Sequence, residues 1–323
     1  MRSAPVIRLI SLAAVAVIVA CTAESGKLPS EPRPGISAMA FFADHSPWSE
    51  PVHLPPPVNS PSRELGASLS PDELSLYFGS DRPRGLGAFD IWVSRRACLE
   101  CPWEAPVNLG PNINSSGGDG APALSHDGLL LFFSGSRAGG EGGEDIWVSR
   151  RTDPKDDLSW GPAVNLGPDV NTAANEGGPA YVPALEGGGA NLYFDRGATL
   201  AGTDIYQVRV TRDGETLGPA APVAELNSSV LDARPAVRAD GREVFFWSNR
   251  MGATDIWVAT RRSPHDPWST PQNLGPPVNT PFGELTPSLS WDGRTLLFSG
   301  TATRGGSLGF QDIWMSTRTP SGR

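Results

Sequence analysis

The sequence predicts an all-β protein, a five-bladed β-propeller with four antiparallel strands in each blade. Three observations lead to this prediction: a motif that recurs five times, a chain rich in turn-forming residues, and incomplete units at the two ends of the repeat array. Of the 323 residues, 37 are glycine and 32 are proline. This content disfavours long uninterrupted helices and favours short strands that are joined by tight turns.

The recurring motif is a short string that begins with aspartate and isoleucine. Asp-Ile-Trp-Val-Ser-Arg-Arg starts at Asp90 and recurs unchanged at Asp145, and related strings start at Asp204, Asp255 and Asp312. The spacings of 55, 59, 51 and 57 residues are typical of an array of supersecondary units, each of which needs its neighbours to bury its apolar face.

Two further markers accompany every copy of the string. An asparagine precedes it and is followed five positions later by an acidic residue, and an arginine follows the middle apolar segment. The pairs are Asn59 and Glu64, Asn114 and Asp119, Asn171 and Glu176, Asn227 and Asp232, and Asn279 and Glu284. The arginines are Arg82, Arg137, Arg196, Arg250 and Arg304. Each unit carries all the markers, so we expect five equivalent blades.

The segments within one unit predict four strands. In the last unit, Pro-Ser-Leu-Ser is followed by the turn Trp291–Gly293, then Thr-Leu-Leu-Phe-Ser-Gly, a glycine-rich loop and the string at Asp312. Aspartate and glycine are the residues that tight hairpin turns require. In the complete units a fourth segment follows, such as Pro-Trp-Glu-Ala-Pro-Val-Asn-Leu-Gly from Pro102. Four such strands make one propeller blade.

The ends of the array predict how the ring closes. An isolated fourth-strand segment, Pro-Trp-Ser-Glu-Pro-Val-His-Leu, begins at Pro47, and the last unit stops after its third strand at Arg318. We therefore expect Trp48–Leu54 to supply the outer strand of the blade that begins at Glu284. Such a closure ties the ends of the propeller together and removes an open sheet edge.

The repeat resembles the TolB-type, WD-like propeller repeats, including those that are fused to OmpA-like peptidoglycan-binding domains. The likeness rests on the Asp-Ile-Trp strand, the turn Ser70-Pro71-Asp72-Glu73 and its counterparts, and the loop with serine and arginine, and it covers residues 47–318. The third unit departs from the pattern, because Leu185–Gly189 replaces the turn. No OmpA-like domain follows, so we do not expect direct peptidoglycan binding.

The amino-terminal residues predict export and lipid anchoring. Arg2 and Arg8 precede an apolar run, Leu9–Val19, that is too short to span a bilayer but long enough for a signal peptide. Ile18-Val19-Ala20-Cys21 resembles a bacterial lipobox, which implies a lipid on Cys21; the alternative is an ordinary secretory signal. The predicted domains are a signal peptide over 1–20, a lipidated cysteine and tether over 21–46, and the propeller over 47–323.

The amino-acid composition limits the classes of binding partner that we expect. Lysine and arginine number 26 against 35 acidic residues, a net charge of −9, and no basic stripe is present that could neutralise phosphates. We therefore expect no nucleic-acid partner. The lipid implies a membrane partner, and Thr22 after the cysteine resembles the pattern of outer-membrane sorting. We expect a monomer that meets an envelope protein or a peptidoglycan-associated complex.

The five acids are the strongest candidates for a binding site. We expect Glu64, Asp119, Glu176, Asp232 and Glu284 to ring the mouth of the central channel, with the five arginines just outside. Such a ring could bind a metal ion, a cationic peptide or a sugar. The structural alternative is that each acid accepts hydrogen bonds from its own connecting loop. We expect no cofactor, although a cation at the ring stays open, and the histidines show no metal-ligand spacing.

The uniform blades favour a non-catalytic binding or scaffolding module for protein, cell-wall or glycan ligands. Catalytic sites are usually asymmetric, with different blades supplying different groups. The alternative is a five-bladed glycoside hydrolase, with Glu176 or Glu284 as general acid and Asp119 or Asp232 as base. Because the third unit departs from the repeat, residues 173–203 are where we expect a ligand first.

Cys98 and Cys101 are separated by two residues in the loop between the third and fourth strands of the first unit. A thioredoxin-like redox motif would need a βαβ context, which the sequence lacks. In an exported protein a local disulfide is the favoured interpretation.

Overall fold

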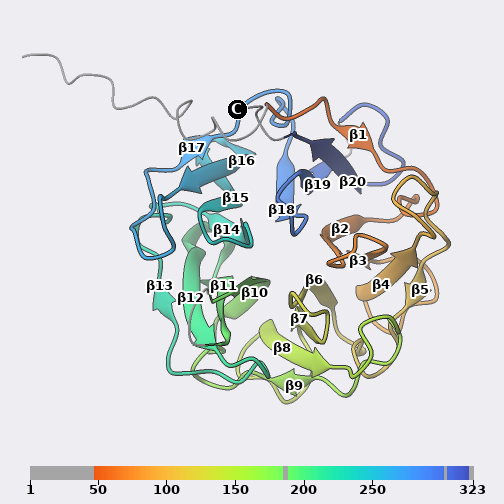
Figure 1. Ribbon diagram of the computed structural model, residues 1–323, viewed down its shortest axis with the longest axis horizontal. Helices are drawn as coiled ribbons and strands as arrows, with labels where there is room; N and C mark the ends of the chain where they lie inside the picture. Colours follow the sequence, from red (N-terminus) through yellow and green to blue (C-terminus); the bar gives the residue numbers. More distant parts are fainter. Residues whose placement is uncertain (1–46, 185–187, 302–303, 320–323) are drawn as a thin grey trace, which may run out of the picture. The chain divides into compact units, whose positions relative to one another are not determined.

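The computed structural model describes residues 47–184, 188–301 and 304–319. They form five four-stranded antiparallel sheets that are arranged around one axis (Figure 1). The prediction of a five-bladed propeller is confirmed. The predicted signal peptide, Cys21 and the tether lie outside the described residues. Within the described ranges, no helix is long and apolar enough to span a membrane.

Each blade runs from the axis outward in chain order. Blade 1 consists of β2 (Glu64–Leu69), β3 (Ser75–Ser80), β4 (Asp90–Arg95) and β5 (Val107–Asn108). Blade 2 consists of β6 (Asp119–Leu124), β7 (Leu130–Gly135), β8 (Asp145–Arg150) and β9 (Val164–Asn165). Blade 3 consists of β10 (Asn175–Pro183), β11 (Ala190–Gly197), β12 (Asp204–Val210) and β13 (Ala221–Pro222), with a short 3₁₀ turn, η3 (Leu200–Gly202), before β12. Blade 4 consists of β14 (Asp232–Val237), β15 (Glu243–Met251), β16 (Ala253–Thr260) and β17 (Gln272–Asn273).

Blade 5 is built from both ends of the propeller. It consists of β18 (Glu284–Leu289), β19 (Thr295–Thr301), β20 (Gln311–Thr317) and β1 (Val52–His53). Strand β1 pairs antiparallel with β20, with Val52 opposite Met315 and His53 opposite Trp314. The predicted closure by the amino-terminal segment is therefore confirmed, and the sheet edge of blade 5 is covered.

The core lies between neighbouring blades. Strand β3 is buried along its whole length, because the blades on both sides cover its two faces. Tyr77 and Ile91 of blade 1 pack with Leu131, Phe133 and Trp147 of blade 2 in one apolar cluster. Complete burial of such side chains contributes about 1.5–3 kcal/mol each. The continuous apolar runs of the second strands, rather than alternating patterns, follow from this two-sided burial.

The repeated asparagines join consecutive blades. Asn114 accepts the backbone N–H of Ile91 at 2.8 Å and donates to its carbonyl at 2.9 Å. Asn59 bonds in the same way to Ile313, at 2.8 and 2.9 Å, across the point where the ring closes. The repeated asparagine thus connects each blade to the preceding one through two hydrogen bonds. The same contact connects the first blade to the last.

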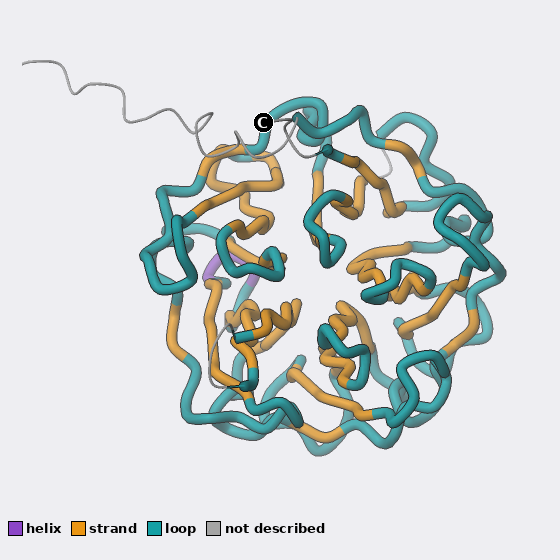
Figure 2. The backbone as a smooth tube through the Cα atoms, in the orientation of Figure 1, coloured by secondary structure: helices purple, strands orange, loops and turns teal. Residues whose placement is uncertain are grey.

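Every innermost strand contains a bulge that brings the backbone close to the axis (Figure 2). The residue at each bulge has a positive φ, a left-handed conformation that costs non-glycine residues about 1 kcal/mol or more. These five residues, the bulge ring, are Gly66 (φ 62°), Ala121 (49°), Gly178 (55°), Arg234 (53°) and Thr286 (47°).

Candidate functional site

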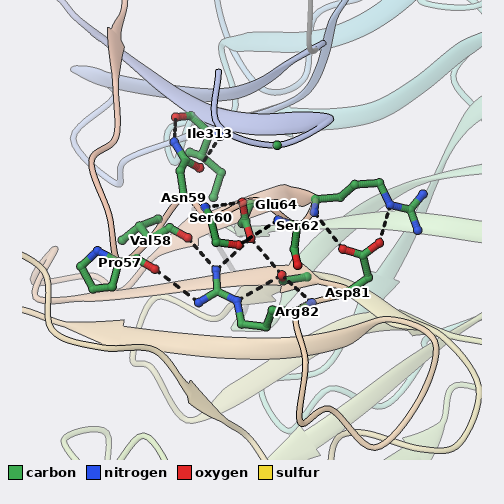
Figure 3. A network of polar contacts seen from close by, with 12 residues as sticks. Pro57, Val58, Asn59, Ser60, Ser62, Glu64, Asp81, Arg82 and Ile313 are labelled. Atoms are coloured by element: carbon green, nitrogen blue, oxygen red, sulfur yellow. Dashed lines mark hydrogen bonds and ion pairs between the residues drawn. The ribbon is translucent and has the colours of Figure 1, made fainter. Parts of the chain in front are cut away.

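The five predicted acids are buried within their own blades. Glu64 accepts the backbone N–H of Ser60 at 3.0 Å, the Ser60 hydroxyl at 2.6 Å and Nη2 of Arg82 at 3.0 Å (Figure 3). Arg82 also donates to the carbonyls of Val58 and Pro57. The carboxylate therefore fastens the loop that enters the blade to the second strand.

The same network recurs in every blade. The acids have exposed fractions of 0–1%. The hydroxyl that each acid accepts comes from the residue four positions earlier: Ser60, Ser115, Thr172, Ser228 and Thr280. The ion-pair partners are the predicted arginines, namely Arg82, Arg137, Arg196, Arg250 and Arg304. Each guanidinium also lies over two aromatic rings of its blade, such as Phe78 and Trp92 at 4.9 and 5.5 Å.

These contacts have a consequence for the predicted roles. Burial raises the pKa of the Glu64, Glu176 and Glu284 carboxyls, and the hydroxyl and arginine contacts only partly offset it. The structure confirms the alternative that each acid accepts hydrogen bonds from its own connecting loop, and it does not show the five carboxylates as an open ring at the channel mouth. The binding roles of the ten residues, and the catalytic roles of Asp119, Glu176, Asp232 and Glu284, stay predictions that would require these contacts to open.

A different charged cluster, which the sequence analysis missed, lies at the channel axis. Arg234 occupies the bulge of β14, and its side chain extends over blade 3 toward blade 2. It fits there because blade 3 has two glycines: a Cβ at Gly177 would lie 2.9 Å from Nη1 of Arg234, and one at Gly178 would overlap its Cδ. The Gly-Gly pair of β10 therefore makes room for one long side chain from the neighbouring blade.

Arg234 brings together two carboxylates from two other blades. Its Nη2 lies 3.7 Å from Oε1 of Glu144 in blade 2, and its Nε lies 3.6 Å from Oδ2 of Asp195 in blade 3. The backbone N–H of Arg234 also donates to Asp195 at 2.9 Å, and Nη1 lies 3.3 Å from the Ser134 hydroxyl. We call Glu144, Asp195 and Arg234 the axial cluster.

The axial cluster breaks the repeat at three positions, and this is the signal that could have revealed it. Where blade 3 has Asp195, the other blades have Gly79, Ser134, Trp247 and Ser299. Where blade 4 has Arg234, the others have Gly66, Ala121, Gly178 and Thr286. Where blade 2 has Glu144, the others have Phe89, Thr203, Thr254 and Gln311. One of the three residues, Asp195, falls within the segment 173–203 that the sequence singled out.

Glu144 has the environment of a proton donor. Its side chain is half-buried beside a cavity, and burial raises the pKa of its carboxyl. The positive charge of Arg234 opposes this rise in pKa, and the negative charge of Asp195 adds to it. A carboxyl with a raised pKa that lies next to a second carboxylate is the arrangement on which general acid chemistry depends.

The cavity beside Glu144 has a volume of about 400 Å³. Its lining includes Phe89, Glu144, Asn175 and Arg234, the predicted acid Asp119, and several glycines and other small residues. This volume lies in the range of small-molecule sites, roughly 300–1,000 Å³.

Two other predicted features concern sulfur and metal chemistry. Cys98 and Cys101 form a disulfide. In the part of the chain that the structure describes, no group of three or more His, Cys, Asp or Glu side chains is placed to hold a metal ion. The prediction that no cofactor is needed stays a prediction.

No protein-family model and no curated protein sequence matches the chain. Solved structures do. An α-L-arabinofuranosidase from Lactobacillus brevis is 16% identical with a TM-score of 0.55, over 82% of this chain and 95% of the other. An endo-arabinase from Bacteroides thetaiotaomicron is 18% identical with a TM-score of 0.51, over 83% and 97%. A putative TolB from Agrobacterium tumefaciens, 14% identical over 81% and 91%, has a TM-score of 0.48.

At these identities the likenesses establish the propeller fold alone. Of the resemblance to TolB-type repeats, the propeller fold is confirmed and the specific family is not. The prediction of a non-catalytic scaffold needs correction, because solved structures with TM-scores of 0.51–0.55 include two α-L-arabinofuranosidases and an endo-arabinase. That prediction relied on the uniformity of the repeat. The uniform residues build the blades, and the asymmetric residues lie elsewhere.

Proposed function

We propose that the protein is a glycoside hydrolase whose reaction takes place at the axial cluster. The observation that carries the proposal is a pair of carboxylates, Glu144 and Asp195, that both lie within 4 Å of the Arg234 guanidinium, while Glu144 and Arg234 line a cavity. Each carboxylate lies within 4 Å of Arg234, so their separation is at most about 10 Å, comparable with the roughly 5–9.5 Å between the two catalytic carboxyls of glycosidases.

Each carboxylate has a separate role in this proposal. Glu144, with its raised pKa, donates a proton to the glycosidic oxygen as the bond to the leaving group breaks. Asp195 accepts a backbone N–H and lies beside a guanidinium, an environment suited to a carboxylate that acts in its ionised form. It acts on the opposite side of the sugar, either on the anomeric carbon or on a water molecule. Arg234 fixes the geometry of both.

The similar structures guide the choice of substrate. Because they include an α-L-arabinofuranosidase and an endo-arabinase, the first substrate to test is an α-L-arabinofuranoside. The purified protein is incubated with 4-nitrophenyl α-L-arabinofuranoside and with the β-D-xyloside, and release of nitrophenol is followed. We expect turnover of at least one of them.

Variants then test the axial cluster. Glu144→Gln and Asp195→Asn are each expected to lower kcat/KM by about 10²–10⁴-fold, the range for loss of a catalytic acid or base. The matched control is Glu141→Gln, because Glu141 lies on the same loop but is exposed and does not line the cavity. Full activity of Glu144→Gln, or equal losses in Glu141→Gln, would refute the assignment.

A further inference from the structure

One polar side chain beside the axial cluster belongs neither to the cluster nor to the repeated networks of the blades. It is Asn175, the first residue of β10, and it lines the pocket, the cavity of about 400 Å³ that Glu144 and Arg234 also line. Its amide oxygen accepts the backbone N–H of Glu144 at 3.1 Å, and its amide nitrogen donates to the Gly197 carbonyl at 3.3 Å. The amide therefore connects the backbone of Glu144 in blade 2 to the second strand of blade 3.

A second hydrogen bond holds the carbonyl of Glu144. This carbonyl accepts the backbone N–H of Glu176 at 2.7 Å. The corresponding contact occurs one blade earlier, where the carbonyl of Phe89 accepts the N–H of Asp119 at 2.8 Å. The contact through the carbonyl is thus a feature of the repeat, and the contact through Asn175 is added to it. Both the N–H and the carbonyl of Glu144 are bonded to β10.

Asn175 also departs from the repeat. Its counterparts have no side-chain atom that accepts a hydrogen bond; they are Arg63, Gly118, Leu231 and Gly283. In blades 1, 2 and 5 the backbone N–H at this position donates to a side chain of the second strand, namely Asp81, Ser136 or Thr301. Blade 3 has Gly197 at that place, opposite Asn175. In blade 3 the polar side chain therefore comes from the first strand, from which it reaches Glu144.

The loop before Glu144 is shaped to accept this amide. A Cβ at Gly143 would lie 2.4 Å from Oδ1 of Asn175, closer than Cβ atoms approach other atoms in proteins. The N–H of Gly143 donates to the carbonyl of Ala174 at 3.3 Å, so the residues that precede Glu144 and Asn175 are also joined. Glycine at position 143 thus allows the amide to reach the backbone of Glu144.

We infer that Asn175 is a positioning residue, which fixes the backbone of Glu144 so that its carboxyl stays beside Arg234 at the wall of the pocket. This inference rests on the proposed function and adds how the general acid is held. Glu144 directly precedes β8, so its own N–H is not part of the strand pairing of blade 2. A misplacement of about 1 Å in a catalytic group can lower a rate roughly 100-fold, so a loop that carries the acid has to be fixed.

The first experiment measures the kinetics of Asn175→Ala with 4-nitrophenyl α-L-arabinofuranoside. We expect kcat to fall about 10- to 100-fold with little change in KM, because the contact acts on the acid and not on the bound substrate. The loss should be much smaller with the 2,4-dinitrophenyl glycoside, whose leaving group needs no proton. A purely structural role of Asn175 would lower the rates for both substrates equally.

Asn175→Asp is the conservative variant, because it keeps an oxygen for the N–H of Glu144 and adds a negative charge beside it. We expect it to retain most of the parental kcat at acidic pH. Its alkaline loss of activity should move to higher pH, because a like charge raises the pKa of the Glu144 carboxyl, while the other charged groups that face Glu144, Arg234 and Asp195, stay unchanged. An unmoved alkaline loss would contradict the placement of Asn175 beside the acid.

Gly143→Ala tests the same contact from the other side, because the added Cβ displaces the amide of Asn175. It should reproduce the loss in kcat, and it should lower kcat little further when it is combined with Asn175→Ala. The control is Thr301→Val, which removes the corresponding contact in blade 5 and lies outside the pocket wall, and which should keep the parental kcat.

The outcomes separate this inference from the proposed function. An unchanged kcat in Asn175→Ala, or a loss that appears in KM alone, would overturn the positioning role and leave the proposed function intact. Absence of turnover of every glycoside by the unaltered protein would refute the proposed function itself.

Discussion

The five buried acid–arginine networks and the axial cluster use the same chemical groups in opposite ways. Glu64 and Arg82 lie 3.0 Å apart, accept or donate several additional hydrogen bonds, and are almost fully shielded from solvent. Arg234 lies 3.6–3.7 Å from its two carboxylates, and one of those, Glu144, is half-exposed beside the pocket. In the first arrangement the carboxylates are bonded by groups of their own blade, whereas in the second Glu144 and Arg234 line a cavity that a ligand can enter.

The difference between the two arrangements indicates which residues of a repeat protein to consider for function. A residue that recurs in every blade is needed to build the blade, and its polar groups bond mainly to groups of that blade. A residue at the axis that differs from its counterparts in the other blades has no such role in building the blade. In this propeller, the three departures Glu144, Asp195 and Arg234 converge on one point, although they come from three blades.

The strongest test of this contrast compares stability with activity. Asp119→Asn leaves Arg137 buried without its counter-charge and turns an amide toward the N–H of Ser115, so we expect a loss of about 3–5 kcal/mol in the free energy of unfolding. Asp195→Asn keeps an oxygen for the N–H of Arg234, and Arg234 keeps Glu144, so we expect a loss of only about 1–2 kcal/mol.

Urea unfolding and initial rates, measured well below the unfolding midpoint, give the two quantities. Asp119→Asn should lose much of its stability, whereas Asp195→Asn should stay stable and lose activity. If Asp119→Asn proved as stable as the parent protein, the repeated networks would not hold the blades together as described.

The pH dependence of activity tests the role of Glu144 as the general acid. Glu144 has to be protonated to act as an acid, and burial raises its pKa, so activity is present below this raised pKa and is lost above it. We expect kcat/KM to fall about tenfold per pH unit on this alkaline side. A 2,4-dinitrophenyl glycoside, whose leaving group needs no proton, serves as the control, and its alkaline loss should be much weaker. Equal losses for both substrates would assign the titration to another group.

The fold could be predicted from the sequence because the same strand-forming motif occurs five times. The repeated asparagine and the strand that begins with Asp-Ile occur in each blade, so the number of blades and the closure by Trp48–Leu54, the segment that contains β1, could be predicted without coordinates. The acids were recognised for the same reason. The sequence left open whether they face solvent or accept hydrogen bonds from their own loops, because a recurring carboxylate at a loop has the same sequence pattern in both cases. The contacts of Glu64 with Ser60 confirm the second alternative.

The axial cluster could not be predicted in the same way. Arg234 is 39 residues from Asp195 and 100 from Ser134, and no local pattern connects them. Their meeting depends on the bulge, which turns the backbone of β14 toward the axis, and on the glycines of β10, which leave space for the arginine. An alignment of the five units would have identified Glu144, Asp195 and Arg234 as departures from the repeat. It would not have shown that the three side chains meet at one point.

The smallest expected effect concerns the bulge ring itself. Ala121 and Arg234 have nearly the same left-handed φ, 49° and 53°, at equivalent positions, and glycine already occupies this position in blades 1 and 3. Ala121→Gly relieves the backbone strain, a gain of about 0.5–1 kcal/mol in the free energy of unfolding after the greater entropy of the unfolded chain is counted. Arg234→Gly relieves the same strain but leaves Asp195, which is 7% exposed, without its guanidinium.

We therefore expect Arg234→Gly to be less stable than Ala121→Gly, as measured by urea unfolding of both variants. The difference between the two measures the contribution of the arginine side chain, because the backbone change is common to both. Equal gains would mean that the side chain contributes nothing to folding, and the contacts of Arg234 would then have to be retained for the reaction alone. A strained residue that the blade does not need is the pattern expected of a functional site.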